Sequence, residues 1–436
     1  MLSHHLAFGS DSPSGDSIVF EPVKNLGIDL NPVSVSELAG KPIKREQYSV
    51  EFAKQNLIPA MGGSVVAVES SKKGYPDLYV VVPGGSNHLL HNNQNGTFTD
   101  VTDKAGLKGT GLDLAAAFAD YDHSDHQSLF VAGVGGVRVY RASPDGSYAD
   151  VTLKTGITNN PSEVDAGIVL FDADGDGYPD LLVAAYTDLA AVPDRPTFLF
   201  PNNFHDGKSR LYHNQHDGTF KDMTEESGLS ANPGRTRKIL AADFDGDGRI
   251  DLLFLRDNKP PALFMNVGKG KFVDKTSDAD EDLIIYAFLD GQAVDLNGNG
   301  KVDLALWSAM ATRVLFNQGE GKFEETKTAV ITQPPHAFGF HGLVADLDGD
   351  GSPDLLAAEA TGSWRLLINH NGRFAATPFV LSSADHLSPG QFAFITPARL
   401  HGDERVSLIA VTKEGQLQVF EKKQAAPAPS APHPAP

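Results

Sequence analysis

An acidic loop of nine residues occurs four times in this chain, with oxygen-bearing residues at the same positions in each copy. The first, third, fifth and ninth positions are Asp or Asn, and the fourth and sixth are glycine. Calcium takes about six to eight oxygen ligands in a flexible shell, which carboxylates and backbone carbonyls can share. Glycine lets the backbone adopt the tight turns that such a loop requires. Each copy is therefore predicted to bind one Ca²⁺.

The predicted ligands are the side chains of the four acidic positions and the carbonyl of the seventh residue. The four sets are Asp172, Asp174, Asp176, Tyr178 and Asp180; Asp243, Asp245, Asp247, Arg249 and Asp251; Asp295, Asn297, Asn299, Lys301 and Asp303; and Asp346, Asp348, Asp350, Ser352 and Asp354. The third set is expected to bind most weakly, because two of its ligands are neutral amides. The loop differs from an EF-hand, which needs Glu at its twelfth position and flanking helices. Val183 stands at that position in the first copy.

Three degenerate copies of the loop begin at Glu69, Asp120 and Arg399. The first has Lys73 where a carboxylate is needed, and the last keeps only the shape of the turn. The Asp120 copy has serine at two ligand positions. We expect these three loops to bind no metal.

The loops mark a repeat of about fifty residues. Their first positions are residues 69, 120, 172, 243, 295, 346 and 399, and only the third unit carries roughly twenty extra residues. Apolar runs flank each complete loop, and Asn95-Gly96 or Asp217-Gly218 marks a second hairpin within a unit. Four-stranded units repeated in this way predict an all-β fold, a seven-bladed β-propeller with four-stranded antiparallel blades. The calcium loops are expected between strands one and two of a blade.

The last unit lacks a fourth strand, which the N-terminal part of the chain is expected to supply. Tyr48 to Phe52 shows the alternation of a half-buried strand and is predicted to close the ring. Ile18 to Val23 is the rival segment. The predicted organisation is a polar extension over residues 1–47, the propeller over 48–421, and a Pro/Ala-rich tail or linker over 422–436.

The repeats resemble the FG-GAP/VCBS family, which includes the propeller of integrin α-subunits and many bacterial surface proteins. The resemblance lies in the four acidic loops and in the apolar runs that follow them. The end of the third unit, residues 211–229, is similar to repeats of bacterial proteins that also carry an ASPIC/UnbV domain. The resemblance implies a calcium-binding propeller but leaves the biological role open, since one fold serves many functions.

Composition limits the possible partners and location. The formal net charge of −20 argues against nucleic acid and against anionic membrane surfaces. The chain has no cysteine, which excludes disulfides and thiolate chemistry. No apolar run approaches the ~20 residues of a membrane span, so we expect no membrane insertion. The first twenty residues show no signal peptide, and we nevertheless expect an extracytoplasmic monomer, secreted, periplasmic or on the cell surface.

The insertion in the third unit, residues 187–207, is the best candidate for a ligand site. It is rich in aromatic residues and should stand on the face away from the calcium loops. Arg195, Phe198, Phe200 and Phe204 are its predicted ligand-binding residues. The alternative is that the insertion only covers the edge of a neighbouring blade.

The predicted function is a calcium-binding extracytoplasmic module that binds or adheres to a protein or a carbohydrate. No catalytic residue is predicted. His213 and His216 are three apart at a hairpin, and a solvated or hydrogen-bonded role is expected for each. Two alternatives stay open: a polysaccharide lyase or hydrolase, whose acids would meet at the hub from distant units, and a structural spacer of a larger surface protein.

Overall fold

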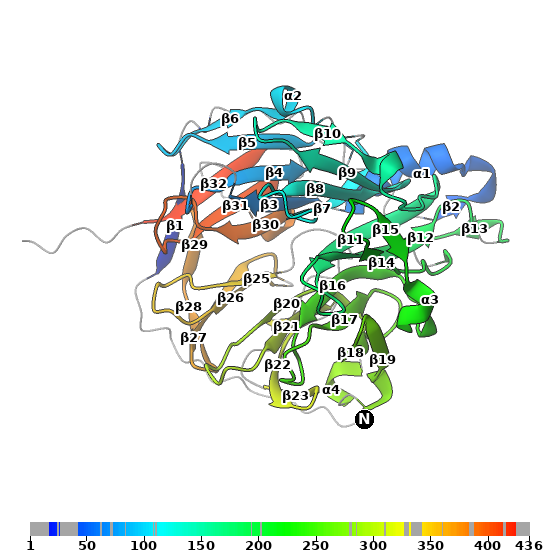
Figure 1. Cartoon of the computed structure of the whole chain (residues 1–436). Helices are drawn as coiled ribbons and strands as arrows, with labels where there is room; N and C mark the ends of the chain where they lie inside the picture. The colour runs from blue at the N-terminus through cyan, green and yellow to red at the C-terminus, as the bar shows by residue number, and fades with distance from the viewer. Residues whose placement is uncertain are drawn as a thin grey trace, which may run out of the picture.

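The computed structural model arranges seven antiparallel sheets around a central axis (Figure 1). The predicted seven-bladed propeller with four-stranded blades is therefore confirmed. The described residues are 17–23, 26, 42–61, 63–69, 73–82, 84–107, 109, 111–192, 194–200, 203–278, 281–284, 286–308, 311–326, 331–332, 342–359, 361–382, 388–412 and 416–423.

Blades one to seven are numbered in the order in which β3, β7, β11, β16, β20, β25 and β30 occur in the chain. Blades one to three consist of β3 (Ser64–Val68), β4 (Asp77–Val81), β5 (His88–Asn92) and β6 (Phe98–Asp100); β7 (Asp113–Ala119), β8 (Ser128–Gly133), β9 (Gly136–Ala142) and β10 (Tyr148–Asp150); and β11 (Glu163–Phe171), β12 (Asp180–Asp188), β14 (Arg210–Asn214) and β15 (Phe220–Asp222). Blades four to six consist of β16 (Thr236–Ala242), β17 (Asp251–Arg256), β18 (Ala262–Gly268) and β19 (Lys271–Asp274); β20 (Phe288–Val294), β21 (Asp303–Ser308), β22 (Ala311–Gly319) and β23 (Lys322–Glu325), with β24 (Ile331–Thr332) beside β22; and β25 (Gly342–Ala345), β26 (Asp354–Ala358), β27 (Trp364–His370) and β28 (Arg373–Thr377). Blade seven consists of β30 (Phe392–Ala398), β31 (Ser407–Thr412), β32 (Leu417–Lys422), β1 (Ile18–Pro22) and β29 (Phe379–Leu381).

The second strand of each blade is the most buried. In β17 and β26 every residue is buried, because both faces of the strand pack against neighbouring blades. A strand that is covered on both faces is continuously apolar rather than alternating. These strands are the apolar runs that follow the acidic loops in the sequence.

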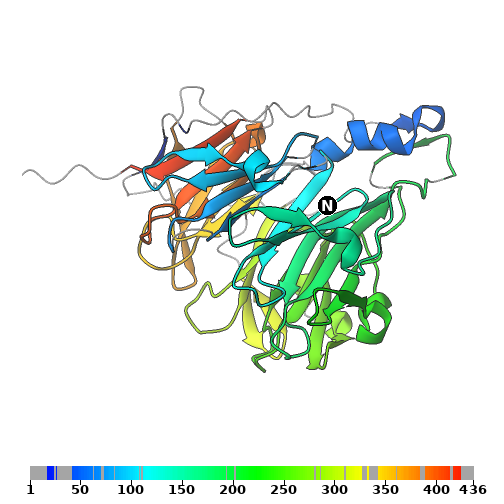
Figure 2. The ribbon, with the colours of Figure 1, turned by 45° about the horizontal axis from the view of Figure 1, so that its top comes forward.

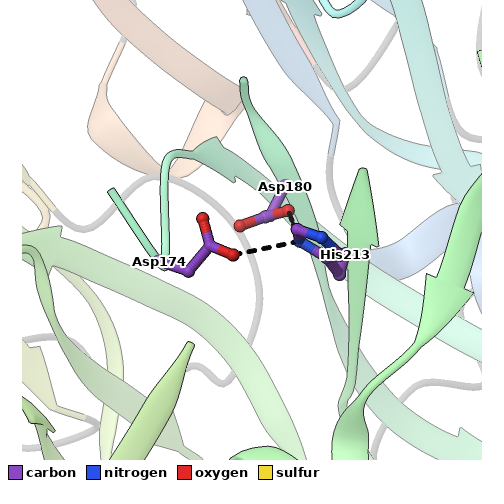
Figure 3. Close-up of side chains that lie close together, drawn as sticks. All are labelled: Asp174, Asp180 and His213. Atoms are coloured by element: carbon purple, nitrogen blue, oxygen red, sulfur yellow. Dashed lines mark hydrogen bonds and ion pairs between the residues drawn. The ribbon is translucent and has the colours of Figure 1, made fainter. Parts of the chain in front are cut away.

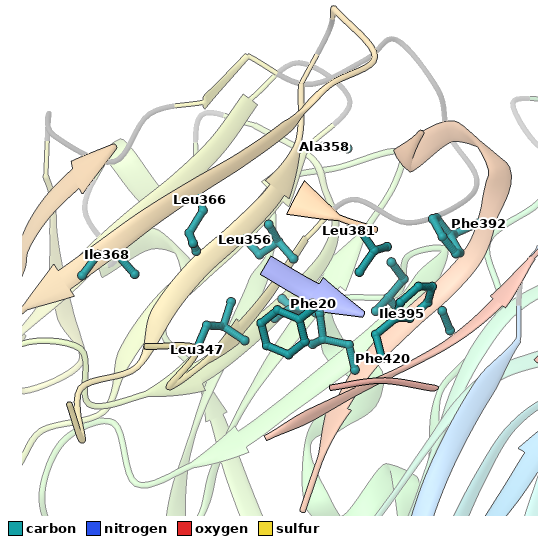
Figure 4. Close-up of a cluster of buried hydrophobic side chains, with 13 residues drawn as sticks. Phe20, Leu347, Leu356, Ala358, Leu366, Ile368, Leu381, Phe392, Ile395 and Phe420 are labelled. Atoms are coloured by element: carbon teal, nitrogen blue, oxygen red, sulfur yellow. The ribbon is translucent and has the colours of Figure 1, made fainter. Parts of the chain in front are cut away.

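The ring closes through β1, which pairs antiparallel with β32, so that Pro22 lies opposite Phe420. On its other edge β1 pairs in parallel with β29. Phe20 is fully buried among apolar side chains of blades six and seven, and its ring centroid lies 5.9 Å from that of Phe379 (Figure 4). A strand from the N-terminal part of the chain thus completes the last blade, as expected.

The prediction that Tyr48 to Phe52 supplies this strand is wrong, and the rival segment is right. Residues Val50–Asn56 form helix α1, which begins at the N-cap Ser49. The Ser49 hydroxyl accepts a hydrogen bond from the Phe52 N–H at 3.0 Å, which satisfies a free donor of the first turn. Five residues of alternating polarity are too few to separate a strand from the apolar stripe of a short helix.

The remaining elements are short. They are β2 (Ile43–Lys44), which pairs with β13 (Thr197–Phe198); helices α2 (Thr102–Ala105), α3 (Thr224–Ser227) and α4 (Glu281–Ile284); and 3₁₀ turns over Arg45–Gln47, Ile58–Met61, Thr152–Lys154, Leu229–Ala231, Thr276–Asp278 and Pro389–Gln391. Most of the predicted tail, residues 424–436, lies outside the described residues.

Candidate metal centres

The four complete acidic loops connect the first and second strands of blades three to six. In blade three, β11 ends at Phe171 and β12 begins at Asp180, the ninth residue of the loop. Asp251, Asp303 and Asp354 begin β17, β21 and β26 in the same way. Since the loops join equivalent strands, all four lie at the same end of their blades.

Each loop is folded around the carboxylate of its first residue. Asp172 Oδ1 accepts hydrogen bonds from the N–H groups of Gly175 at 2.8 Å and Asp176 at 3.1 Å, and its Oδ2 accepts one from Gly177 at 2.8 Å. Gly175 and Gly177 have φ of +86° and +92°, a backbone conformation that other residues avoid. Glycine is favoured here by this conformation and not by lack of space, since a Cβ at either position would meet no described atom within 4 Å. The first Asp of every other complete loop accepts the same bonds from its fourth and sixth residues.

The ninth carboxylate joins the loop to the third strand of the blade. Asp251 Oδ2 accepts the Phe244 N–H at 2.9 Å, and its Oδ1 accepts the N–H of Asn266 in β18 at 2.7 Å. The equivalent bonds of Asp180 run from Ala173 at 3.0 Å and Asn214 at 2.8 Å. The position of this carboxylate is thus set by three chain segments.

In blades one, three, four, five and six, an asparagine in the third strand joins the blade to the preceding one. Asn266 Nδ2 donates to the Ala173 carbonyl of blade three at 3.0 Å. The equivalent bonds run from Asn92 to Leu400, from Asn214 to Tyr121, from Asn317 to Phe244 and from Asn369 to Leu296. Sequence reasoning missed these residues, although in blades one, four, five and six an Asn recurs fourteen or fifteen residues after the ninth loop position.

The loop carboxylates converge closely enough to hold a cation. Oxygen atoms of Asp172, Asp174 and Asp176 lie within 4.8 Å of one another, and the other two all-acid loops each contain such a group: Asp243, Asp245 and Asp251, and Asp346, Asp348 and Asp354. Burial raises the pKa of Asp251 to about 6 and that of Asp354 to about 6, and nearby carboxylates add to the effect. A divalent cation would offset this repulsion, so the donor set fits the hard, oxygen-seeking Ca²⁺.

The loop of blade five has the same backbone arrangement with fewer charges. The Asp295 carboxylate accepts the N–H groups of Gly298 and Gly300, each at 2.8 Å. Asn299 Oδ1 accepts the Lys301 N–H at 2.8 Å, as Asp247 does in blade four with Arg249 at 2.9 Å. The weaker affinity for Ca²⁺ that is expected of this loop therefore results from its smaller negative charge, because its backbone geometry is the same.

Three of the seventh residues direct their side chains at neighbouring structure. The Lys301 ammonium donates to the Gln318 carbonyl at 3.1 Å, and Arg249 Nε donates to the Asn266 carbonyl at 2.7 Å. The Tyr178 ring is stacked between His123 and His216, with centroid distances of 3.8 and 4.0 Å. These contacts leave the seventh backbone carbonyl as the group that the residue can offer to an ion.

The degenerate loops hold cationic side chains of their own. In blade two, Arg141 Nε lies 2.6 Å from Asp122 Oδ2, so a guanidinium lies against the third-position carboxylate. In blade seven, Arg405 Nε lies 2.6 Å from Asp403 Oδ2. An equivalent ion pair joins Arg249 to Asp247 in the complete loop of blade four, so the lack of metal expected for the loops beginning at Asp120 and Arg399 stays a prediction.

Two histidines reach the loop of blade three, which sequence reasoning did not expect to converge there. His213 Nδ1 lies 3.1 Å from Asp180 Oδ1 and 3.5 Å from Asp174 Oδ2 (Figure 3). His216 Nε2 lies 2.5 Å from Asp176 Oδ2. The sequence predicts hydrogen-bonded histidines, but which acids they contact depends on where the hairpin of β14 and β15 lies relative to the loop.

The insertion of blade three packs against α1 instead of presenting an aromatic surface. Phe200 and Phe204 are buried, and the Phe204 ring centroid lies 5.6 Å from that of Tyr48. Figures 1 and 2 show α1 at the rim of the ring beside this insertion. Packing against α1 and β12 excludes these two side chains from solvent, and their role in ligand binding stays a prediction. Arg195 is exposed, and Phe198 belongs to β13.

Comparison with known proteins agrees with the repeat structure. A family model described as an FG-GAP-like repeat matches residues 72–131, 187–254 and 295–357. Cartilage acidic protein 1 of Mus musculus and of Homo sapiens is 29% identical to the chain over 163 residues, or 34% of the chain. The match covers only 25% of the mouse protein and 24% of the human protein.

Two solved structures match the chain at low identity and with TM-scores below 0.5. One is an Agrocybe aegerita lectin that recognises non-reducing terminal N-acetylglucosamine, at 19% identity and a TM-score of 0.44 over 72% of this chain and 79% of the lectin. Another is BBS1N in complex with ARL6DN, at 13% identity and a TM-score of 0.49 over 85% of this chain and 94% of the other. Among the described residues, no helix is both long and apolar enough to cross a membrane. The chain thus contains segments that match FG-GAP-like repeats, and these segments fall within the repeating blades.

Proposed function

We propose that this protein is a calcium-stabilised propeller that works outside the cytoplasm as a binding or adhesion module for a glycan or a protein. The observation that carries the proposal is the convergence of preorganised carboxylates in the loops of blades three, four and six. FG-GAP-like repeats are typical of extracellular proteins, which supports the location. The absence of cysteine from the sequence leaves metal loops, and not disulfides, to reinforce such a fold.

Bound calcium would neutralise the loop carboxylates and hold the first two strands of a blade together. Hydrogen bonds within the chain connect the loop to the third strand and to the preceding blade. Asp251 connects the loop to β18 through the Asn266 N–H, and the Asn266 side chain donates to blade three. The same connections recur in blades three, five and six. An ion in one loop therefore supports the joint between two blades.

A cavity of about 430 Å³ next to the loop of blade six is the best-supported place for a ligand. It lies between blades six and seven, and its walls include Asp346, His401, Arg405 and Lys422. Ligand sites for small molecules measure about 300–1,000 Å³ and combine apolar walls with a few placed polar groups. The cavity is lined by cationic hydrogen-bond donors and by anionic acceptors, and such a lining suits a hydroxyl-rich ligand such as a saccharide.

A glycan array read in millimolar calcium and again in EDTA, with a parallel degradation assay, tests this function. Calcium-dependent binding of an uncut glycan is the expected result. Formation of a cleaved product would instead indicate an enzyme. No signal in either assay would argue against a glycan ligand and would favour a protein ligand or a structural spacer.

A further inference from the structure

The four complete loops differ in the side chain that faces them from the third strand. In blade three Leu181 pairs with Tyr212, so the next pair toward the loop is Asp180 with His213. The same register places Met265 opposite Asp251, Phe316 opposite Asp303 and Ile368 opposite Asp354. At this register position blade three alone among these four has an imidazole, whereas the other three have an apolar side chain.

The imidazole is placed where a metal ligand would be. His213 Nδ1 lies 3.1 Å from Asp180 Oδ1 and 3.5 Å from Asp174 Oδ2, and one atom from each residue lies within 4.8 Å of the others. Zinc bonds to nitrogen and oxygen of ~2.0–2.2 Å place the ligand atoms of a tetrahedral site about 3.3–3.6 Å apart. The three side chains come from the loop, β12 and β14, and they point toward one another in Figure 3.

The donor chemistry separates this loop from the others. Calcium is a hard cation that selects oxygen, whereas imidazole suits zinc and other first-row transition metals. A single proton on His213 Nδ1 can serve only one of its two carboxylate neighbours well, while a cation can interact with all three groups at once. A second imidazole, that of His216, lies 2.5 Å from Asp176 in the same loop.

We propose that the loop of blade three binds a transition-metal dication such as Zn²⁺ through Asp174, Asp180 and His213, and binds it more tightly than calcium. This inference rests on the proposed cation binding and names the preferred ion at one of its sites. The loops of blades four to six, which have no imidazole opposite the ninth carboxylate, keep their preference for calcium. The protein then responds to two different metals through the same repeated element.

Cobalt(II) is the probe, because it replaces zinc in such sites and its visible absorption reports the coordination geometry and the ligand set of the bound ion. The full chain is titrated with Co²⁺ in the presence of about 2 mM calcium, and Zn²⁺ is then added in competition. We expect one equivalent of Co²⁺ to bind with a ligand-field band that Zn²⁺ abolishes. His213→Met, which installs the residue that blade four has at this position, should weaken Co²⁺ binding by at least about tenfold.

Two further variants keep the result interpretable. His370→Met is the matched control, because His370 Nδ1 lies 3.0 Å from Asp350 of the blade-six loop but outside the register position of His213. It should leave the band unchanged. Met265→His places an imidazole opposite Asp251 and should create a second Co²⁺ equivalent.

The readings separate this inference from the proposed function. If calcium raises the melting temperature while the cobalt band is absent, or is unaltered by His213→Met, the inference is overturned and calcium binding stands. If calcium also leaves the melting temperature unchanged, the proposed calcium function fails as well. A cobalt band that depends on His213 and survives in excess calcium supports the inference whatever calcium does at the other loops.

Discussion

At the scale of single residues, the buried acids of this protein have two different tasks. Those of the loops gather where a cation can neutralise them. Asp165, by contrast, lies away from the loops at the start of β11, fully buried, and shares the Arg210 guanidinium with Glu163. Two carboxylates thus face one cation, and burial raises the pKa of Asp165 to about 7.

This pKa predicts a pH dependence of stability with a definite sign. A carboxyl whose pKa is higher in the folded state binds its proton more tightly there, so its contribution to stability falls as the pH rises from about 4 to about 7. Asp165→Asn removes the titration and keeps an acceptor for Arg210. The melting temperature of this variant, relative to that of the parent protein, should increase as the pH rises from about 4 to about 7. Equal shifts at pH 4 and pH 7 would contradict the assignment.

A single loop carboxylate should matter only when calcium is present. An ion at 1 mM with a dissociation constant of ~10⁻⁴ M stabilises the folded state by about 1.4 kcal/mol. Asp247→Ala should lose up to about that amount in 1 mM calcium and little in EDTA, as measured by paired thermal melts. Glu226→Ala, which removes an exposed acid outside the loops, is the control. A similar loss in both buffers would assign Asp247 a role unrelated to calcium.

At the scale of elements, the asparagine in the third strand of five blades joins that blade to the preceding one. Asn266 is buried and donates to the carbonyls of Ala173 at 3.0 Å and Ile250 at 3.2 Å. Asn266→Ala leaves both carbonyls without this donor and should cost about 2–6 kcal/mol, since each unsatisfied buried group costs about 1–3 kcal/mol. Urea unfolding measures it. The exposed turn residue Asn95 is the comparison, and a loss no greater than that of Asn95→Ala would refute the joint.

The elements also show how far the sequence could lead. The acidic loops, the apolar second strands and the hairpin turns repeat often enough to predict the blades and their order. The closing strand could not be chosen, because Tyr48 to Phe52 alternates like a strand while the Ser49 cap starts a helix. The approach of His213 to Asp174 depends on how the third strand pairs with the second. That register is set by packing across the whole blade.

At the scale of the whole molecule, the two ends of the ring are held by β1. Its residue Phe20 is fully buried between blades six and seven. Deleting residues 1–16 leaves β1 intact and should be tolerated. Deleting residues 1–23 exposes β32 as an unpaired edge and should cause aggregation, which size-exclusion chromatography would detect. A monomeric, folded protein after the longer deletion would show that the ring closes without β1.

The central claim is that the repeated acidic loops hold cations, and anomalous scattering from crystals grown in calcium tests it most directly. The account predicts a metal peak in each of the loops that begin at Asp172, Asp243, Asp295 and Asp346, with the weakest at Asp295. It predicts none at Glu69, Asp120 or Arg399. Peaks in two or fewer of the four complete loops would contradict it.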